Sequence, residues 1–158
     1  MDAYVLLKVA HILGSTVLFG TGLGTALHFW LANRSGDARA IAVSARSTVF
    51  ADFAFTTPAI VLQPATGIAM ALVAGFPLSS PWIVASIALY FLAGACWVPV
   101  VFIQLRLRRM AEQAAQANAP LDTRYASLLR AWFLLGWPAF VALLMVFWLM
   151  VAKPSFAA

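Results

Sequence analysis

The feature that most constrains this chain is a run of 53 residues, 53–105, without Asp, Glu, Lys or Arg. A second uncharged run of 22 residues covers 131–152. One helical crossing of a bilayer takes about 20 apolar residues. Across the 158 residues, 64% are hydrophobic and 9% charged, whereas soluble domains are about a quarter charged. The sequence therefore predicts an integral membrane protein.

Breaks in the apolar pattern divide the chain into four predicted spans. Asn33–Gly36 and the turn Gly75–Pro81 are rich in helix-breaking residues, and Asp37 and Asp122 are good N-caps for the helices that follow them. Lipid offers backbone groups no hydrogen-bonding partner, so uninterrupted apolar runs cross it as helices. We expect an all-α, polytopic, antiparallel four-helix bundle in one membrane domain, with spans at residues 4–32, 48–74, 82–105 and 131–152.

The basic residues predict the orientation. Eight arginines lie in or beside the first and third connections, whereas Lys8 and Lys153 lie on the other side. Positive residues concentrate in cytoplasmic loops, so we expect a protein of the bacterial inner membrane with both termini in the periplasm. Because the cations are scattered around apolar runs, the net charge of +5 does not indicate nucleic-acid binding. The expected partners are the lipid bilayer and either a second copy of the chain or a redox partner.

Polar residues inside the spans form two stripes. At about 100° per residue, the second span places Asp52, Thr56, Ala59, Gln63, Thr66 and Met70 on one face, and the first span places Lys8, His11, Ser15, Gly22 and Thr25 on one half, with His28 beside them. We expect the stripes to face each other. Ser, Thr and Gln side chains in such stripes usually join helices, whereas titratable groups in lipid are candidates for function.

The sequence also predicts an ion pair of Asp52, a glycine surface on the first span and a belt of aromatic residues at the cytoplasmic boundary. Asp52 should pair with His28, or with Arg130 as the competing partner, because an unpaired carboxylate there is costly. The pair Gly20 and Gly24, with Gly14, should provide a surface for close approach of another helix or a flat ligand. Aromatic belts should include three residues at the inner boundary, Trp30, Tyr125 and Trp132.

The sequence contains no recognisable set of catalytic residues for hydrolysis. Asp52 is the only acid inside a span, and no catalytic triad, HExxH motif or carboxylate pair is present. The single cysteine, Cys96, lies in an apolar run and is interpreted as a packing residue. His11 and His28 are 17 residues apart on one helix, roughly 25 Å, so they cannot ligate one metal ion together. Four prolines should each free a backbone carbonyl about one turn earlier, namely Pro58, Pro64, Pro99 and Pro138.

Short motifs spread over nearly the whole chain resemble a known superfamily. They are Lys8-x-x-His11-Ile12, Phe19-Gly20, Gly22-Leu23, Thr57-Pro58-Ala59, Gly67, Trp82, Trp137-Pro138 and Lys153-Pro154. The pattern resembles the superfamily of bacterial membrane protoporphyrinogen oxidase and the copper-resistance protein D membrane domain. Within it, the chain is most similar to an uncharacterised family of bacterial integral membrane proteins. The resemblance implies a small helical bundle.

The resemblance also implies a haem or porphyrin ligand at His11, the histidine of the Lys-x-x-His motif. The oxidases carry a lysine in the third span where this chain has Ser86 or thereabouts, and a Pro-Arg where it has Leu27-His28. These departures argue against porphyrinogen oxidation. They leave haem b binding, with His11 as the axial metal ligand, Met70 or Met145 as the second ligand, and Lys8 meeting a propionate.

The sequence therefore leaves two alternative functions. The first is a membrane protein that binds haem b or a porphyrin in a redox role through His11. The second is a non-catalytic accessory protein or small permease, in which the stripe with Asp52 and Gln63 provides helix packing or a narrow pathway.

Overall fold

The computed structural model describes residues 2–154 as a bundle of long helices. The elements are α1 (Ala3–Ser35), α2 (Ala38–Ala51), the π-helix η1 (Asp52–Thr56), α3 (Thr57–Val73), α4 (Pro81–Ala117) and α5 (Thr123–Ala152). Because α2, η1 and α3 follow one another without a break, the described chain has four helices long and apolar enough to cross a membrane. The predicted all-α four-helix membrane bundle is confirmed.

Helix ends follow the capping signals in the sequence. Asp37 and Asp122 each accept a hydrogen bond from a backbone N–H two residues later, at 2.9 and 2.7 Å. Gly36 closes α1 with a φ of 70°, and Asn118 closes α4 with a φ of 49°. This left-handed conformation suits glycine and asparagine best. The tight turns keep consecutive helices antiparallel.

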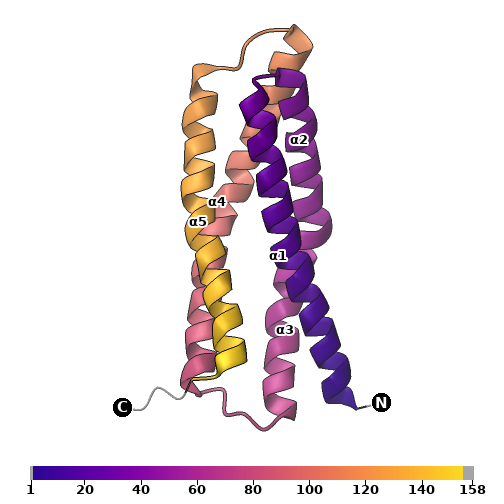
Figure 1. Ribbon diagram of the computed structural model, residues 1–158, viewed down its shortest axis with the longest axis vertical. Helices are drawn as coiled ribbons and strands as arrows, with labels where there is room; N and C mark the ends of the chain where they lie inside the picture. The colour runs from indigo at the N-terminus through magenta and orange to yellow at the C-terminus, as the bar shows by residue number, and fades with distance from the viewer. Residues whose placement is uncertain (1, 155–158) are drawn as a thin grey trace.

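Helix α1 begins and helix α5 ends at the same end of the bundle, which we call the terminal end (Figure 1). The opposite end carries the short connections at residues 36–37 and 118–122 and is called the arginine-rich end. Near the terminal end the bundle separates into two pairs, α1 with α3 and α4 with α5 (Figure 1). The site described below lies between these two pairs, in the middle of the bundle.

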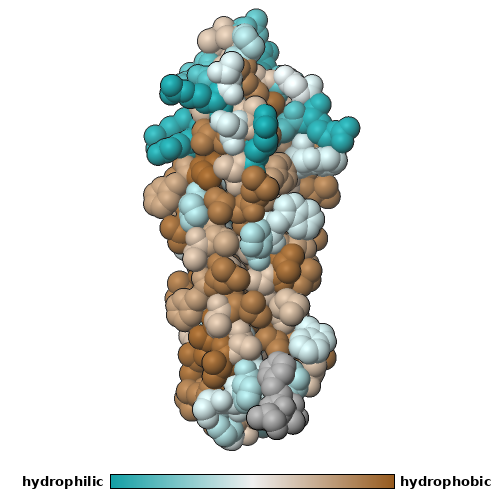
Figure 2. Space-filling view, turned by 90° about the vertical axis from the view of Figure 1, so that its left-hand side faces the viewer, coloured by the Kyte–Doolittle hydropathy of each residue, from teal (hydrophilic) through white to brown (hydrophobic). Residues whose placement is uncertain are grey.

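The hydrophobic core lies toward the arginine-rich end. Phe29 of α1, Ile41 of α2 and Leu107 of α4 are almost completely buried there, packed with Tyr125 and Trp132 of α5. The prediction that Tyr125 and Trp132 belong to an aromatic belt is wrong. Both rings are buried, because α5 is rotated so that they face the inside of the bundle. Outside the core, the surface is mostly hydrophobic below a polar arginine-rich end (Figure 2), as lipid contact requires.

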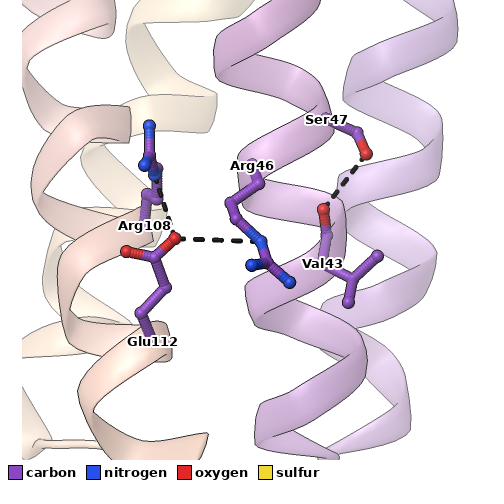
Figure 3. A network of polar contacts seen from close by, with 5 residues as sticks. All are labelled: Val43, Arg46, Ser47, Arg108 and Glu112. Carbon is purple, nitrogen blue, oxygen red and sulfur yellow. Dashed lines mark hydrogen bonds and ion pairs between the residues drawn. The ribbon is translucent and has the colours of Figure 1, made fainter.

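An ion-pair cluster ties α2 to α4 at the arginine-rich end. The Glu112 carboxylate lies 3.1 Å from Arg108 on its own helix and 3.8 Å from Arg46 on α2 (Figure 3). Ser47, beside Arg46, donates a hydrogen bond to the Val43 carbonyl at 3.1 Å (Figure 3). Because Arg46 is well exposed, we expect this cluster to contribute little to stability, about 0–1 kcal/mol.

Candidate functional site

A cavity of about 690 Å³ lies between the two helix pairs. It is bracketed by contacts between α1 and α5: Phe29 packs edge-on against Trp132, with centroids 5.4 Å apart, and Phe19 stacks on Phe140 at 5.0 Å. Its walls are apolar and rich in aromatic side chains, which include Trp30, Tyr90, Trp97, Trp132, Phe133, Trp137 and Phe140. The cavity therefore offers a ring-shaped or branched apolar molecule extensive contact.

Asp52 forms the polar end of this cavity. Its side chain is buried and accepts two hydrogen bonds, from the Thr56 hydroxyl at 2.9 Å and from Gln104 Nε2 at 2.6 Å. Gln104 Oε1 in turn accepts a hydrogen bond from Trp132 Nε1 at 3.2 Å. We call Asp52, Thr56, Gln104 and Trp132 the Asp52 cluster. An indole nitrogen can only donate, so Trp132 fixes the orientation of the Gln104 amide and directs its NH₂ group to the carboxylate.

The local backbone explains how Asp52 comes to face the cavity. A π-helical turn begins at Asp52, and both the N–H and the hydroxyl of Thr57 bond to the Asp52 carbonyl. Pro58 follows directly, and its ring cannot donate to the carbonyl four residues earlier. Such single π turns often occur at functional sites. The wider turn accommodates Pro58 without a break between α2 and α3.

The expected pairing of Asp52 with His28 or Arg130 is wrong. His28 and Arg130 are exposed, and the ion pairs formed within residues 2–154 both involve Glu112. The rotation of α1 explains the error, because Phe29 takes the core position and places His28 about 100° away. Neutral donors from η1 and α4 surround the carboxylate instead.

His11 lies outside the cavity, at the contact of α1 with α3. Its Nδ1 is 2.8 Å from the Thr66 hydroxyl oxygen, and that hydroxyl donates its own proton to the Leu62 carbonyl at 2.7 Å. With its proton on the Leu62 carbonyl, the Thr66 oxygen accepts from Nδ1–H. In that tautomer Nε2 keeps its lone pair, and no residue of the described chain forms a hydrogen bond with Nε2.

Two glycines allow the helices to approach closely at this point. A Cβ added at Gly67 would lie 3.1 Å from His11 Cε1, and one added at Gly14 would collide with Gln63 Nε2. The buried Gln63 donates to the His11 carbonyl at 3.0 Å. The two polar stripes thus face each other here, as expected, and Gly14 provides close approach.

Gly20 and Gly24 do not provide such a contact. An added Cβ at either position would meet nothing within 4 Å, so the expected GxxxG packing surface is wrong within this chain. Both glycines are exposed and neither lines the cavity, so they lie on the lipid-facing side of α1.

The other proposed haem-site residues are not assembled around His11. Met70 is half-buried on α3, while Lys8 on α1 and Met145 on α5 are exposed, and none of the three lines the cavity. Within residues 2–154, no three His, Cys, Asp or Glu side chains gather to hold a metal ion. Of these four residues, His11 is the one whose side chain has a hydrogen-bonding partner in the described chain, the Thr66 hydroxyl.

Sequence reasoning missed Gln104, Trp132 and Tyr90 as site residues. The Tyr90 hydroxyl donates to the Ile60 carbonyl, which Pro64 leaves without its usual backbone donor. Two signals could have pointed to them: Gln104 is the only side-chain amide in the third span, at the depth of Asp52, and Pro64 implies a carbonyl that needs a donor.

Fold and site together define a polytopic helical membrane protein with a half-open, largely apolar cavity between its helix pairs and one carboxylate in the cavity wall. The chain belongs to the DUF2269 family, described as a predicted integral membrane protein, which it matches over residues 5–154. No curated protein and no solved structure matches it. The family description supports the expected membrane family and names no activity.

Proposed function

We propose that this protein binds an apolar small molecule within the bilayer, in the manner of a carrier or small permease rather than an enzyme. The observation that carries the proposal is the cavity between the helix pairs, with its aromatic walls and the single Asp52 cluster. At about 690 Å³, it falls within the range of about 300–1,000 Å³ usual for ligand sites. A few polar groups in an apolar cavity orient a ligand, and here they come from three different helices.

The proposed setting is the bacterial inner membrane, with the arginine-rich end in the cytoplasm. The support is the positive-inside rule applied to the eight arginines. With this orientation Asp52 lies toward the cytoplasmic side, and the cavity extends from it toward the middle of the bilayer.

Quenching of tryptophan fluorescence tests the proposal. Trp30, Trp97, Trp132 and Trp137 line the cavity, so a heavy-atom quencher that enters it, such as the neutral compound 1-bromonaphthalene, should quench a saturable fraction of the emission. A quencher that only partitions into detergent gives a linear, non-saturable decrease.

Two glycine variants provide the matched comparison. Gly136 lines the cavity and Gly20 does not, and an added Cβ meets nothing within 4 Å at either position. We expect Gly136→Leu to fill part of the cavity and abolish the saturable component, and Gly20→Leu to retain it. Saturable quenching of equal strength in both variants, or none in the wild type, would overturn the proposal.

Haem b or porphyrin binding at His11 is the second candidate function. The free Nε2 of His11 supports it, because the Thr66 hydroxyl holds Nδ1 as metal-bound histidines are commonly held. The cavity lining contains no His, Cys or Met, so the histidine site would be separate, on the α1–α3 face. When bound, a haem would supply one-electron redox chemistry, while His11 would hold it and Lys8 would meet a propionate.

A haem titration tests this candidate. Purified protein with haem supplied should develop a Soret band that His11→Ala abolishes. Thr66→Val, which removes the hydroxyl that orients the imidazole, should shift the band or weaken binding. A spectrum identical in wild type and His11→Ala would leave His11 as a helix-packing residue.

A further inference from the structure

We propose that the molecule bound in the cavity is an apolar organic cation, such as an aromatic or quaternary ammonium compound. This inference rests on the proposed binding function and names the ligand class. It follows from two independent features of the site, the charge of Asp52 and the arrangement of the aromatic rings.

The hydrogen bonds of the Asp52 cluster all run toward the carboxylate. Trp132 donates to Gln104, Gln104 donates to one carboxylate oxygen, and Thr56 donates to the other. Donors on both oxygens favour the ionised form of a carboxyl group, because that form accepts at both oxygens and has no proton to place. The cluster therefore suits an anion better than a neutral acid.

No cationic side chain of residues 2–154 neutralises this anion. The two partners expected from the sequence, His28 and Arg130, are exposed, and Arg46 and Arg108 pair with Glu112. Arg34 lies over the Trp30 ring, 4.9 Å from its centroid. An ionised carboxylate beside an apolar cavity is costly unless a cation accompanies it. A cationic ligand would supply the missing charge.

The aromatic walls suit the same ligand class. Trp97, Trp132 and Trp137, from α4 and α5, line the cavity together with Tyr90. Faces of indole and phenol rings attract cations, and aromatic cages are the usual means of binding quaternary ammonium groups. A neutral apolar molecule would gain the contact area but would leave Asp52 without a counter-charge.

A pair of probes of nearly equal shape separates charge from hydrophobicity. Tetraphenylphosphonium is an apolar cation, and tetraphenylmethane is its neutral counterpart. We expect the purified full-length protein, in phosphatidylcholine nanodiscs, to bind radiolabelled tetraphenylphosphonium saturably and at least about tenfold more tightly than tetraphenylmethane, since a tenfold ratio corresponds to the energy of one modest charge interaction. Empty nanodiscs give the partitioning background.

Asp52 variants test the assigned residue. Asp52→Asn keeps the size of the side chain and can still accept from Gln104, and we expect it to lose at least about tenfold in affinity for tetraphenylphosphonium. Asp52→Glu, which keeps the charge, should recover most of that loss. Glu112→Gln, which removes an acid of α4 outside the cavity lining, should bind like the wild type. Size-exclusion profiles and unfolding temperatures identify any variant that fails to fold.

The outcomes separate this inference from the proposed function. Saturable quenching by 1-bromonaphthalene without binding of tetraphenylphosphonium would overturn the cation inference and keep the binding function. Equal binding of both tetraphenyl probes, or wild-type affinity in Asp52→Asn, would also overturn it. Failure of both the quenching and the cation measurements would overturn the two proposals together.

Discussion

At the scale of single residues, Gln104 determines much of the site. Its amide group bridges Trp132 of α5 and Asp52 of η1 from a buried position on α4. One side chain thus satisfies a donor on one helix and an acceptor on another. Buried polar networks of this kind are stabilising only while every member is satisfied.

We expect Gln104→Leu to lower the free energy of unfolding by about 1–3 kcal/mol, because it leaves one oxygen of the buried Asp52 carboxylate and the buried Trp132 N–H without partners. Thermal unfolding in detergent, followed by circular dichroism, measures the change. The control is Gln113→Leu on the exposed part of the same helix, which should change the unfolding free energy little. An unchanged unfolding temperature in Gln104→Leu would contradict the assigned role.

A second residue-scale prediction concerns Gly14. Gly14→Ala should cost about 1–3 kcal/mol, because the added Cβ displaces the end of the buried Gln63 side chain and so removes its hydrogen bond to the His11 carbonyl. Gly20→Ala should be neutral or stabilising, since its Cβ meets no neighbour and alanine favours a helix. Comparison of the two unfolding temperatures checks the prediction, and equal effects would contradict it.

At the scale of elements, proline residues determine how the second membrane helix joins its neighbours. Pro58 follows the π turn η1, which carries Asp52, and Pro64 frees the Ile60 carbonyl, which Tyr90 of α4 then occupies. Both prolines therefore generate a polar feature on the inward face of the helix. The side chains of Asp52 and Tyr90 both line the cavity.

A double-mutant cycle tests the link between Tyr90 and Pro64. Tyr90→Phe should cost about 1 kcal/mol by removing the donor to Ile60. In a Pro64→Ala background the new backbone N–H can bond to the Ile60 carbonyl, so Tyr90→Phe should cost clearly less. Unfolding free energies of the four proteins give the coupling. Equal costs in the two backgrounds would mean that Tyr90 does not replace the missing backbone donor.

At the scale of the whole molecule, the charged, tightly packed part and the cavity lie at different positions along the bundle axis. The arginine-rich end has the tightly packed core and the Glu112 ion pairs, whereas the cavity lies in the middle of the bundle, between the two helix pairs. The packed end thus holds the four helices together, while the middle of the bundle leaves room for a ligand. This division agrees with a binding function inside the membrane.

Reporter fusions test the proposed orientation of the molecule. A reporter active only in the periplasm should be active at the C-terminus and inactive after Asp37, because the positive-inside rule, applied to the eight arginines, predicts that the first and third connections are cytoplasmic. A cytoplasmic reporter at the same two positions should give the opposite pattern. The reverse result for both reporters would place the arginine-rich end in the periplasm.

The sequence by itself determined the class, the helices and their ends. Uncharged runs, capping residues such as Asp37 and Asp122, and the periodicity that puts Asp52 and Gln63 on an inward face are local properties, because each depends on neighbours within one helix. The polar contact of His11 with the second stripe also followed from this periodicity. Such features need no knowledge of how the helices cross.

Only the tertiary structure decided what Asp52 pairs with, where Trp132 points and where the cavity lies. These depend on the rotation and separation of helices that are distant in sequence: turning α1 so that Phe29 faces inward removes His28 from Asp52, and turning α5 inward brings Trp132 to Gln104. Nearly every face of a membrane-spanning helix is apolar, so the hydrophobic pattern does not determine how the helix is rotated about its own axis. The packing of glycines, aromatic rings and a few hydrogen bonds selects it instead.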